Sequence, residues 1–439
     1  MDGRVLDPRT ADLARLRRLP PHDLAEILYD LNPSELAHLF TRFGDEDLAD
    51  LVAELDPHDA GRLILKLSLA QAADVLEEMP PDDAADVVEE LSPSQARAIL
   101  QEMEPDEARQ LKELLAYPEG SAGHLMTPKY VAVSPDMTAE EALVALRHVA
   151  EEAESVYYVY VKDPETNRLL AVLPLYNLFF AKPQTPVRDI MNRDVAKVRA
   201  DAPQEEAARL LNQYHFIALP VVDDADRLLG IITADDAAAV LREEATEDIE
   251  RLGGSQPLDE PYLTASPFTL ARKRIGWLLL LFVAQAYTGT VMRHFQNDLQ
   301  QVVALAFFIP LLIGTGGNTG SQTVTTVIRA MALGELRFRD AFRVWLKELG
   351  TAFILATAMA LATLVRAWTL NVTTAIGLTV ALAASAIVLW AATVAALLPL
   401  VLRRLRVDPA VVSAPLISTL VDGTGLIIYF EIARRVLRL

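Results

Sequence analysis

The sequence contains no cysteine. This absence excludes disulfides, thiolate metal sites and cysteine nucleophiles. Histidine is also scarce, with seven in the chain and only His294 after Phe268. Because soft transition metals bind mainly through cysteine and histidine, any metal handled by the C-terminal half is expected to meet oxygen ligands.

Positive charge is scarce in residues 1–268, which hold 24 Lys and Arg against 53 Asp and Glu. From residue 269 onward the balance reverses, with 16 basic and 7 acidic residues. A strongly acidic half argues against nucleic acid as a partner and favours cations. The first twenty residues also lack the apolar run of a signal peptide, so the N-terminus is expected to start in the cytoplasm.

A twelve-residue repeat runs through the N-terminal region, and most of its units begin with proline followed by acidic residues. Examples are PPDDAADVVEEL (80–91) and EPDEARQLKELL (104–115). Proline in the first helical turn followed by Asp or Glu suits a helix start. We therefore predict short helices that stack into an α-solenoid, because each is too short to be stable alone. The repeat positions are Pro21, Pro33, Asp45, Pro57, Leu69, Pro81, Pro93 and Pro105.

An internal duplication occupies about residues 125–240. LMTPKYVAVSPDMTAEEALVAL begins at Leu125, and IMNRDVAKVRADAPQEEAARLL begins at Ile190. Each copy continues into two apolar strands, which predicts a compact α/β module. The pair resembles cystathionine-β-synthase-type (CBS) domains, most specifically at RLLGIITADD (227–236), where that family often binds an adenine nucleotide. The first copy reads LLAVLPLYN instead, so at most one nucleotide pocket is expected. A CBS pair that serves only a structural role is as well supported as one that binds a nucleotide.

Five apolar stretches of membrane-spanning length follow, at about 275–295, 301–333, 347–368, 375–402 and 410–434. Basic clusters before the first, between the second and third, and between the fourth and fifth predict one cytoplasmic face. The C-terminus is then expected outside, although Arg434, Arg435 and Arg438 oppose the positive-inside rule there. Glu431 lies three and four residues before the first two, which predicts local pairing.

The second stretch contains PLLIGTGGNTGSQ (310–322). Glycine at this density either unwinds a helix or lets another backbone approach closely, and irregular backbone in a membrane must line protein or water. Tight packing of small residues is the alternative. Because Asn318 and Gln322 belong to the same run, we predict a hydrated pore lined by Gly316, Gly317, Asn318 and, from the fifth stretch, Gly425.

Asp422 is the only acidic residue near the middle of any predicted span. A carboxylate at that depth costs about 2.5–3.5 kcal/mol even on the mild insertion scale, so it marks an ion or proton path. Proline and glycine around it predict a broken helix. The alternative is a buried aspartate that hydrogen bonds to Ser418, Thr419 or Thr424.

The ion that suits this site is Mg2+. Ca2+ takes six to eight oxygen ligands, whereas Mg2+ keeps most of its waters and uses one or two carboxylates. One aspartate from each of two subunits supplies two carboxylates, which suits a hydrated Mg2+ ion.

The three regions together resemble the MgtE-type magnesium channel family. The most specific segments are GTGGNTGSQ (314–322), LRRLRVDPA (402–410) and PLISTLVDGTGLIIY (415–429). The resemblance implies a homodimer with the second and fifth spans around the pore, and Asp422 as the selectivity residue. Backbone carbonyls one turn earlier, near Ser418, would contact the water shell of the ion, and Ser418 and Thr419 join Asp422 as candidate residues of the pore metal site. Ala414 departs from members that have asparagine there, so that side chain has no pore role here.

The family also implies inhibition by cytoplasmic Mg2+, which the acidic half can explain. Carboxylates splay apart at low Mg2+ and are drawn together when divalent ions bridge them. The segment DDAAAVLREEATEDIERL (235–252) predicts a long acidic helix leading toward the first span. The candidate regulatory ligands are Asp82, Asp86, Glu205, Asp236, Glu244, Glu247 and Asp248.

These features predict a multidomain membrane protein with an α-solenoid domain (1–120), an α/β CBS pair (121–238), a connecting helix (239–268) and an all-α five-span domain (269–439). The expected function is a Mg2+-selective channel in the inner (plasma) membrane, closed by cytoplasmic Mg2+. The alternative is a CBS-regulated secondary transporter that couples another divalent cation, Co2+ or Mn2+, to protons. The glycine run lacks the lysine of a Walker loop, and no nucleophile–base pair is visible, so we expect no enzyme.

Overall fold

The computed structural model describes residues 45–150, 153–258, 262, 265–405 and 407–439, together with residues 19, 27 and 28. Within it the chain forms two compact units, Met1–Glu243 and Glu244–Leu439. The predicted repeat starts at Pro21 and Pro33 lie outside the described residues.

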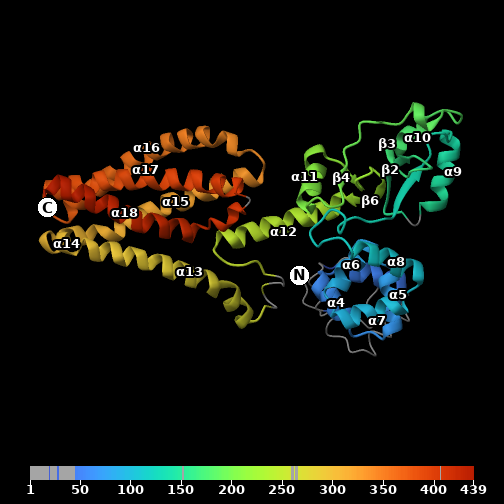
Figure 1. Ribbon diagram of the computed structural model, residues 1–439, viewed down its shortest axis with the longest axis horizontal. Coiled ribbons are helices and arrows are strands. Elements are labelled where there is room, and N and C mark those ends of the chain that lie inside the picture. Colours follow the sequence, from blue (N-terminus) through green and yellow to red (C-terminus); the bar gives the residue numbers. More distant parts are fainter. Residues whose placement is uncertain are drawn as a thin grey trace. The chain divides into compact units, whose positions relative to one another are not determined.

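Short helices follow one another every twelve residues in the first unit. They are α4 (Pro57–Ile64), α5 (Leu69–Glu78), α6 (Pro81–Glu89), α7 (Pro93–Glu102) and α8 (Pro105–Leu114). Four of them begin with proline, and α6 and α8 carry two acidic residues each in the first turn. Alternate helices pack together along the curved array in Figure 1, α4 on α6 on α8 and α5 on α7. The predicted solenoid of mutually supporting helices is confirmed.

Two small three-stranded sheets form the centre of the duplicated region. The first module contains β1 (Tyr130–Val133), α9 (Ala139–Val149), β2 (Ser155–Lys162), β3 (Leu169–Pro174) and α10 (Leu175–Phe180). The second contains β4 (Val198–Arg199), α11 (Gln204–Tyr214), β5 (Ala218–Val222), β6 (Leu228–Thr233) and α12 (Ala234–Leu252). In each sheet the first pair of strands is parallel and the second antiparallel. This repetition confirms the predicted pair of α/β modules.

The solenoid and the second module share one apolar core within the first unit. Buried residues of α4–α8 belong to the same cluster as Ala207 of α11, Leu219 of β5 and Ile232 of β6. The segment after α8 pairs with the second module through its backbone: Gly123 N–H donates to the Ala200 carbonyl at 2.9 Å. Ala84 of α6 and Ala237 of α12 belong to the same cluster, so α6 lies near the start of α12, where three of the four acidic candidates of this unit are found.

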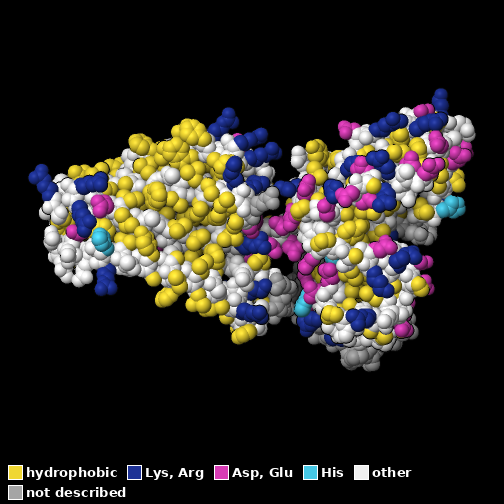
Figure 2. Space-filling view, in the orientation of Figure 1, with side chains coloured by type: hydrophobic (Ala, Val, Ile, Leu, Met, Phe, Trp, Pro, Cys, Tyr) yellow, Lys and Arg dark blue, Asp and Glu magenta, His cyan; other side chains and the backbone are white. Residues whose placement is uncertain are grey.

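Five helices of the second unit are long and apolar enough to cross a membrane. They are α13 (Pro267–His294), α15 (Ile309–Ala332), α16 (Ala341–Thr369), α17 (Thr374–Arg404) and α18 (Ala414–Leu437), with the short α14 (Gln296–Gln301) after the first. These helices lie lengthwise beside one another in Figure 1. In Figure 2 hydrophobic side chains cover the middle of this unit, and Lys and Arg side chains gather at its two ends. The all-α five-span prediction is confirmed.

Candidate ion pathway and regulatory carboxylates

Asp422 lies near the middle of α18, which is one uninterrupted helix from Ala414 to Leu437. The predicted break around this residue is therefore wrong. Pro415 stands in the first turn, where it does not interrupt helical hydrogen bonds, and the later glycines keep helical geometry. An intact helix satisfies its backbone without help from water, which the interior of a membrane demands.

The carboxylate of Asp422 is half-buried in the single chain, and the Gln285 side chain of α13 lies beside it. No basic side chain in the described part of the chain forms an ion pair with it. Sequence reasoning missed Gln285, although an amide in the middle of an apolar span is a detectable signal. The charge of Asp422 therefore has no counter-ion among the described residues.

The glycine run lies inside α15, which is also continuous from Ile309 to Ala332. Of the two predicted effects of glycine, unwinding is therefore wrong and close approach is right. A Cβ on Gly316 would lie 2.6 Å from Ile387 Cγ2 of α17, and one on Gly320 would lie 2.5 Å from Ile417 Cγ2 of α18. Both distances are shorter than real contacts, so only glycine lets these helices pack at this spacing.

Three predicted pore-lining glycines lie against neighbouring helices of the same chain. Gly316, Gly317 and Gly425 are buried, and a Cβ on Gly317 would lie 3.1 Å from the Ser418 hydroxyl. Ser418 Oγ also lies 3.3 Å from Ser321 Oγ, so this side chain faces α15. The Thr419 hydroxyl donates to the Pro415 carbonyl at 2.9 Å. Gly317 and Ser418 thus set the packing of α15 on α18, whereas Gly425 faces Ile387 of α17. A pore role for these residues stays a prediction.

Asn318 differs from these glycines because it is exposed on the surface of the single chain. Gln322, Thr325 and Thr326 are exposed on the same helix, four, seven and eight residues after Asn318. Residues at such spacing share one face of a helix. We call these four residues the polar face of α15. Amide groups facing lipid are costly, so this face is expected to meet protein or water.

The C-terminal end of α18 carries the basic residues that oppose the predicted topology. Arg434 Nε donates to the buried Asp298 carboxylate of α14 at 3.0 Å, and its guanidinium lies 4.5 Å from the centre of the Phe295 ring. Glu431 lies 3.5 Å from Arg434 and 3.9 Å from Arg435, as predicted. Local partners therefore offset most of this positive charge. Asp298 was missed because its partner is distant in sequence.

The inner end of α18 is tied to α13 and to the end of α12. Trp277 Nε1 donates to Ser413 Oγ at 3.1 Å, and Ser413 caps the first turn of α18. Arg251 of α12 pairs with Asp408 at 2.9 Å and with Glu247 at 2.6 Å. The last turns of α12 thus contact the segment that leads into the helix of Asp422.

Acidic side chains gather between α6 and the start of α12 in the first unit. Asp82 is 8% exposed, and its Oδ1 has no hydrogen-bond partner among the described residues. Burial raises the pKa of Asp82 well above its usual value, and the charges of Asp236, Asp83 and Glu154 raise it further. Burial raises the pKa of Asp83 to about 7, again with the charge of Asp236 as the next cause. We call Asp82, Asp83, Asp86, Glu154, Asp235 and Asp236 the carboxylate cluster.

Three predicted regulatory residues, Asp82, Asp86 and Asp236, belong to this cluster, and Asp83, Glu154 and Asp235 were missed. The cluster is not a finished metal site, since no three acidic or histidine side chains of the described residues are spaced to hold an ion. Like charges at such spacing repel one another, and a cation between them would reduce that repulsion.

The other four predicted regulatory residues lie elsewhere. Glu205 is in the first turn of α11, where acidic residues suit the helix dipole. Glu244, Glu247 and Asp248 lie on the part of α12 that belongs to the second unit. There burial raises the pKa of Asp248, the charge of Asp408 raises it further, and Arg251 and Arg329 oppose the shift. Asp248 and Asp408 therefore form a second, smaller group of facing carboxylates.

His124 is a further residue that sequence reasoning missed. It is 5% exposed, and its Nε2 lies 3.3 Å from Asp86 Oδ1 and 3.3 Å from Glu89 Oε2 of α6. The neighbouring carboxylate of Asp86 is the main cause that raises the pKa of His124. One ring thus links α6 to the segment that enters the CBS pair.

Three family models cover most of the chain. The MgtE intracellular N domain matches residues 19–120, and the CBS domain matches residues 122–182 and 187–243. The MgtE model, described as a divalent cation transporter, matches residues 309–432.

Curated relatives agree with these matches. The magnesium transporter MgtE of Thermus thermophilus is 46% identical over 330 residues, which cover 74% of this chain and 72% of that protein. The magnesium transporter MgtE of Bacillus subtilis is 38% identical over 73% of this chain and 70% of that protein. The chain belongs to the MgtE family of magnesium transporters. It is therefore a multi-pass membrane transporter with cytosolic N-terminal domains, and it is not an enzyme.

Among solved structures, the chain is similar to the cytosolic domain of the Mg2+ channel MgtE in complex with ATP. The identity is 36%, the TM-score is 0.44, and the match covers 52% of this chain and 97% of that one. In the chain described here, Thr233 and Asp236 are hydrogen-bonded to each other at the start of α12. These two residues of the RLLGIITADD segment therefore cap this helix, and Asp236 also belongs to the carboxylate cluster.

The pKa shifts in this MgtE-family chain predict that the folding stability of the first unit depends on pH. A carboxyl whose pKa is higher in the folded than in the unfolded state binds more protons when folded, so stability falls as pH rises through that interval. For Asp83 the interval runs from its ordinary value of 3.8 to about 7. The contact of His124 with Asp86 and Glu89 also becomes less stabilising as pH rises, because a histidine with a raised pKa then loses its positive charge. Without Mg2+, α6 is expected to open more readily at pH 8 than at pH 5.

Hydrogen exchange of the α6 amides in the full-length protein, measured in detergent with a chelator present, tests this prediction. Asp83→Asn should flatten the pH dependence, after correction for the intrinsic exchange rate. Glu102→Gln on α7, an exposed position, should leave the dependence unchanged. Equal protection of α6 at both pH values would contradict the prediction.

Proposed function

We propose that this chain is a Mg2+-selective channel that carries Mg2+ into the cell and closes when cytoplasmic Mg2+ binds its carboxylates. The observation that carries the proposal is Asp422: a carboxylate in the middle of an apolar helix, without a basic partner among the described residues. Such a group is costly in a membrane unless it serves a cation. The membership of the chain in a magnesium transporter family supports Mg2+ as that cation.

We further propose that two copies of the chain form the pathway. The polar face of α15 supports this assembly, since exposed amide and hydroxyl groups on a membrane helix are best satisfied against a second copy and a water-filled path. Two Asp422 carboxylates then face one ion. Mg2+ gives up its waters reluctantly, so it is expected to pass largely hydrated between them, with the C-terminus of each copy outside.

Gating is proposed to depend on the carboxylate cluster and on the group around Asp248. Without Mg2+, burial and mutual repulsion disfavour the charged forms in both groups. A divalent cation favours the charged forms and draws them together. Because α12 contributes to both groups and Arg251 near its end contacts the segment before α18, ion binding along α12 can be transmitted to the helix of Asp422.

An adenine nucleotide at the second CBS module remains a separate proposal. The second module keeps the glycine, threonine and aspartate of the CBS pattern at Gly230, Thr233 and Asp236. A nucleotide that binds there would compete for the mutual hydrogen bond of Thr233 and Asp236. It would therefore be expected to alter the carboxylate cluster, which makes its binding dependent on Mg2+.

Ion flux into liposomes that contain the purified full-length chain tests the channel proposal. We expect Mg2+ uptake to follow the Mg2+ gradient and the membrane potential, and to persist when a protonophore collapses the proton gradient. Excess Ca2+ should compete weakly, because the proposed site binds a hydrated ion through only two carboxylates. If collapse of the proton gradient alone stops uptake at a clamped potential, the chain is a proton-coupled secondary transporter instead.

A further inference from the structure

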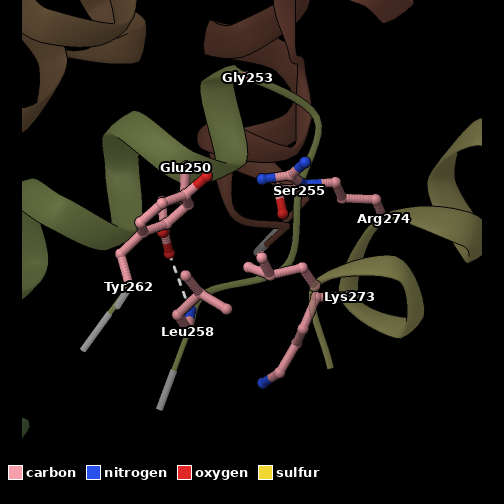
Figure 3. Close-up of a pocket in the computed structure, with 8 residues that line it drawn as sticks. Glu250, Gly253, Ser255, Leu258, Tyr262, Lys273 and Arg274 are labelled. Carbon is pink, nitrogen blue, oxygen red and sulfur yellow. Dashed lines mark hydrogen bonds between the residues drawn. The ribbon is translucent and has the colours of Figure 1, made fainter. Parts of the chain in front are cut away.

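A cavity of about 320 Å³ opens beside the first turns of α13. Its walls come from the end of α12, the loop after it and the start of α13, all within the second unit. Figure 3 shows the residues that give the cavity its chemistry: Glu250, Ser255, Leu258, Tyr262, Lys273 and Arg274. The channel mechanism proposed above uses none of them.

One wall of the cavity carries a carboxylate in a fixed position. Glu250 Oε2 accepts the backbone N–H of Leu258 at 2.8 Å, which fastens the loop to the end of α12. The side chain of Glu250 is half-buried, and Tyr262 lies beside it in Figure 3. Because the Leu258 N–H occupies one carboxylate oxygen, the other remains available to a hydrogen-bond donor of a ligand.

The facing wall carries cationic side chains from the second turn of α13. In Figure 3 the Arg274 guanidinium extends over the loop to a position beside Ser255, whereas the amino group of Lys273 points away. Arg274 is exposed, so its planar group can reach a phosphate at the mouth of the cavity. A guanidinium binds phosphate through two parallel hydrogen bonds, which makes the contact both strong and specific in its orientation.

The helix that supplies this cationic wall continues as an apolar surface. Ile275, Leu278, Phe282 and Val283 of α13 are 51% to 74% exposed in the single chain. Since the domains before α13 are cytosolic, the cavity lies at the cytoplasmic end of this span. A molecule in the cavity can therefore place a polar head among the charged walls and an acyl chain along α13.

From this arrangement we infer that the cavity binds the headgroup of a zwitterionic glycerophospholipid with a primary ammonium group, such as phosphatidylethanolamine. The phosphate diester lies against the Arg274 guanidinium, and the ammonium donates to the free oxygen of Glu250. A purely anionic headgroup suits the cavity less well, because Glu250 repels it. A choline headgroup satisfies Arg274 but offers Glu250 no N–H donor.

Native mass spectrometry of the delipidated full-length chain in detergent tests this inference with three lipids of equal acyl length. Phosphatidylethanolamine is expected to form a one-to-one adduct at about tenfold lower concentration than phosphatidylcholine or phosphatidylglycerol, the effect of one charge-assisted hydrogen bond. Stronger binding of phosphatidylglycerol would overturn the inference. Water-soluble phosphoethanolamine is expected to compete poorly. If it displaces the lipid at equal concentration, the cavity is a site for a free phosphoethanolamine.

Two variants separate the contributions of the two walls. Arg274→Gln should weaken adducts of all three lipids about tenfold, because each has a phosphate. Glu250→Gln keeps an acceptor for the Leu258 N–H, so the loop is retained, and it should abolish the preference for ethanolamine over choline. Arg339→Gln, which removes an exposed charge elsewhere on the second unit, is the matched control and should change nothing. Equal effects of Arg274→Gln and Arg339→Gln would show that the cavity is not the binding site.

Discussion

Replacing Asp422 by asparagine is expected to lower Mg2+ flux into liposomes at least tenfold while the protein stays folded. Asparagine keeps the volume of the side chain but removes the negative charge that attracts a passing hydrated cation. Burying a carboxylate at this depth costs about 2.5–3.5 kcal/mol, so the variant should be at least as stable as the native protein. Loss of flux without loss of stability distinguishes a functional aspartate from a structural one.

Two further variants complete the experiment. Asp422→Glu retains the charge with one more methylene and should keep measurable flux with altered selectivity. Gln285→Ala removes the polar side chain beside Asp422 and should reduce flux less than Asp422→Asn does. Size-exclusion chromatography and thermal unfolding establish folding and assembly in each case. Normal Mg2+ flux through a well-folded Asp422→Asn protein would exclude this residue from the ion path.

Neutralising three acidic residues of α6 is expected to leave the channel open at Mg2+ concentrations that close the native protein. The triple variant Asp82→Asn, Asp83→Asn, Asp86→Asn removes the charge from half of the carboxylate cluster. The cytoplasmic Mg2+ concentration for half-closure should rise at least tenfold, since one lost charge-assisted contact already corresponds to about that factor. Patch recording from giant liposomes, with Mg2+ varied on the cytoplasmic side, measures the shift.

A matched triple variant separates local from general charge effects. Glu102→Gln, Asp106→Asn and Glu113→Gln remove the same charge from exposed positions on α7 and α8, outside the cluster. This control should close at the native Mg2+ concentration. Because removing buried like charges relieves repulsion, the α6 variant should fold normally. Closure of both variants at the native concentration would leave the carboxylate cluster without a role in gating.

The general plan of the molecule followed from periodicity in the sequence. Proline recurs every twelve residues, and helices begin at Pro57, Leu69, Pro81, Pro93 and Pro105. These boundaries were predictable because a proline in the first turn and a following carboxylate are local signals. The five spans were predictable for a similar reason, since apolar length alone sets them.

Predictions that required knowledge of neighbours were less accurate. The glycines of α15 suggested a break, but Ile387, Ile417 and Val421 fill the space they leave, and the helix stays intact. Asp83 and Glu154 were missed because their importance comes from Asp236, which is distant in sequence. Gln285 and Asp298 were missed for the same reason: each meets a partner on α18 more than one hundred residues away.

The sequence by itself determined the solenoid, the duplicated modules, the five spans and the one carboxylate in the middle of a span, because each depends on local composition and spacing. Only the tertiary structure decided that the glycines serve helix packing and that Gln285 contacts Asp422. It also decided which carboxylates face one another across α6 and α12. These features depend on distances between residues far apart in the chain, and local propensity carries no information about such distances.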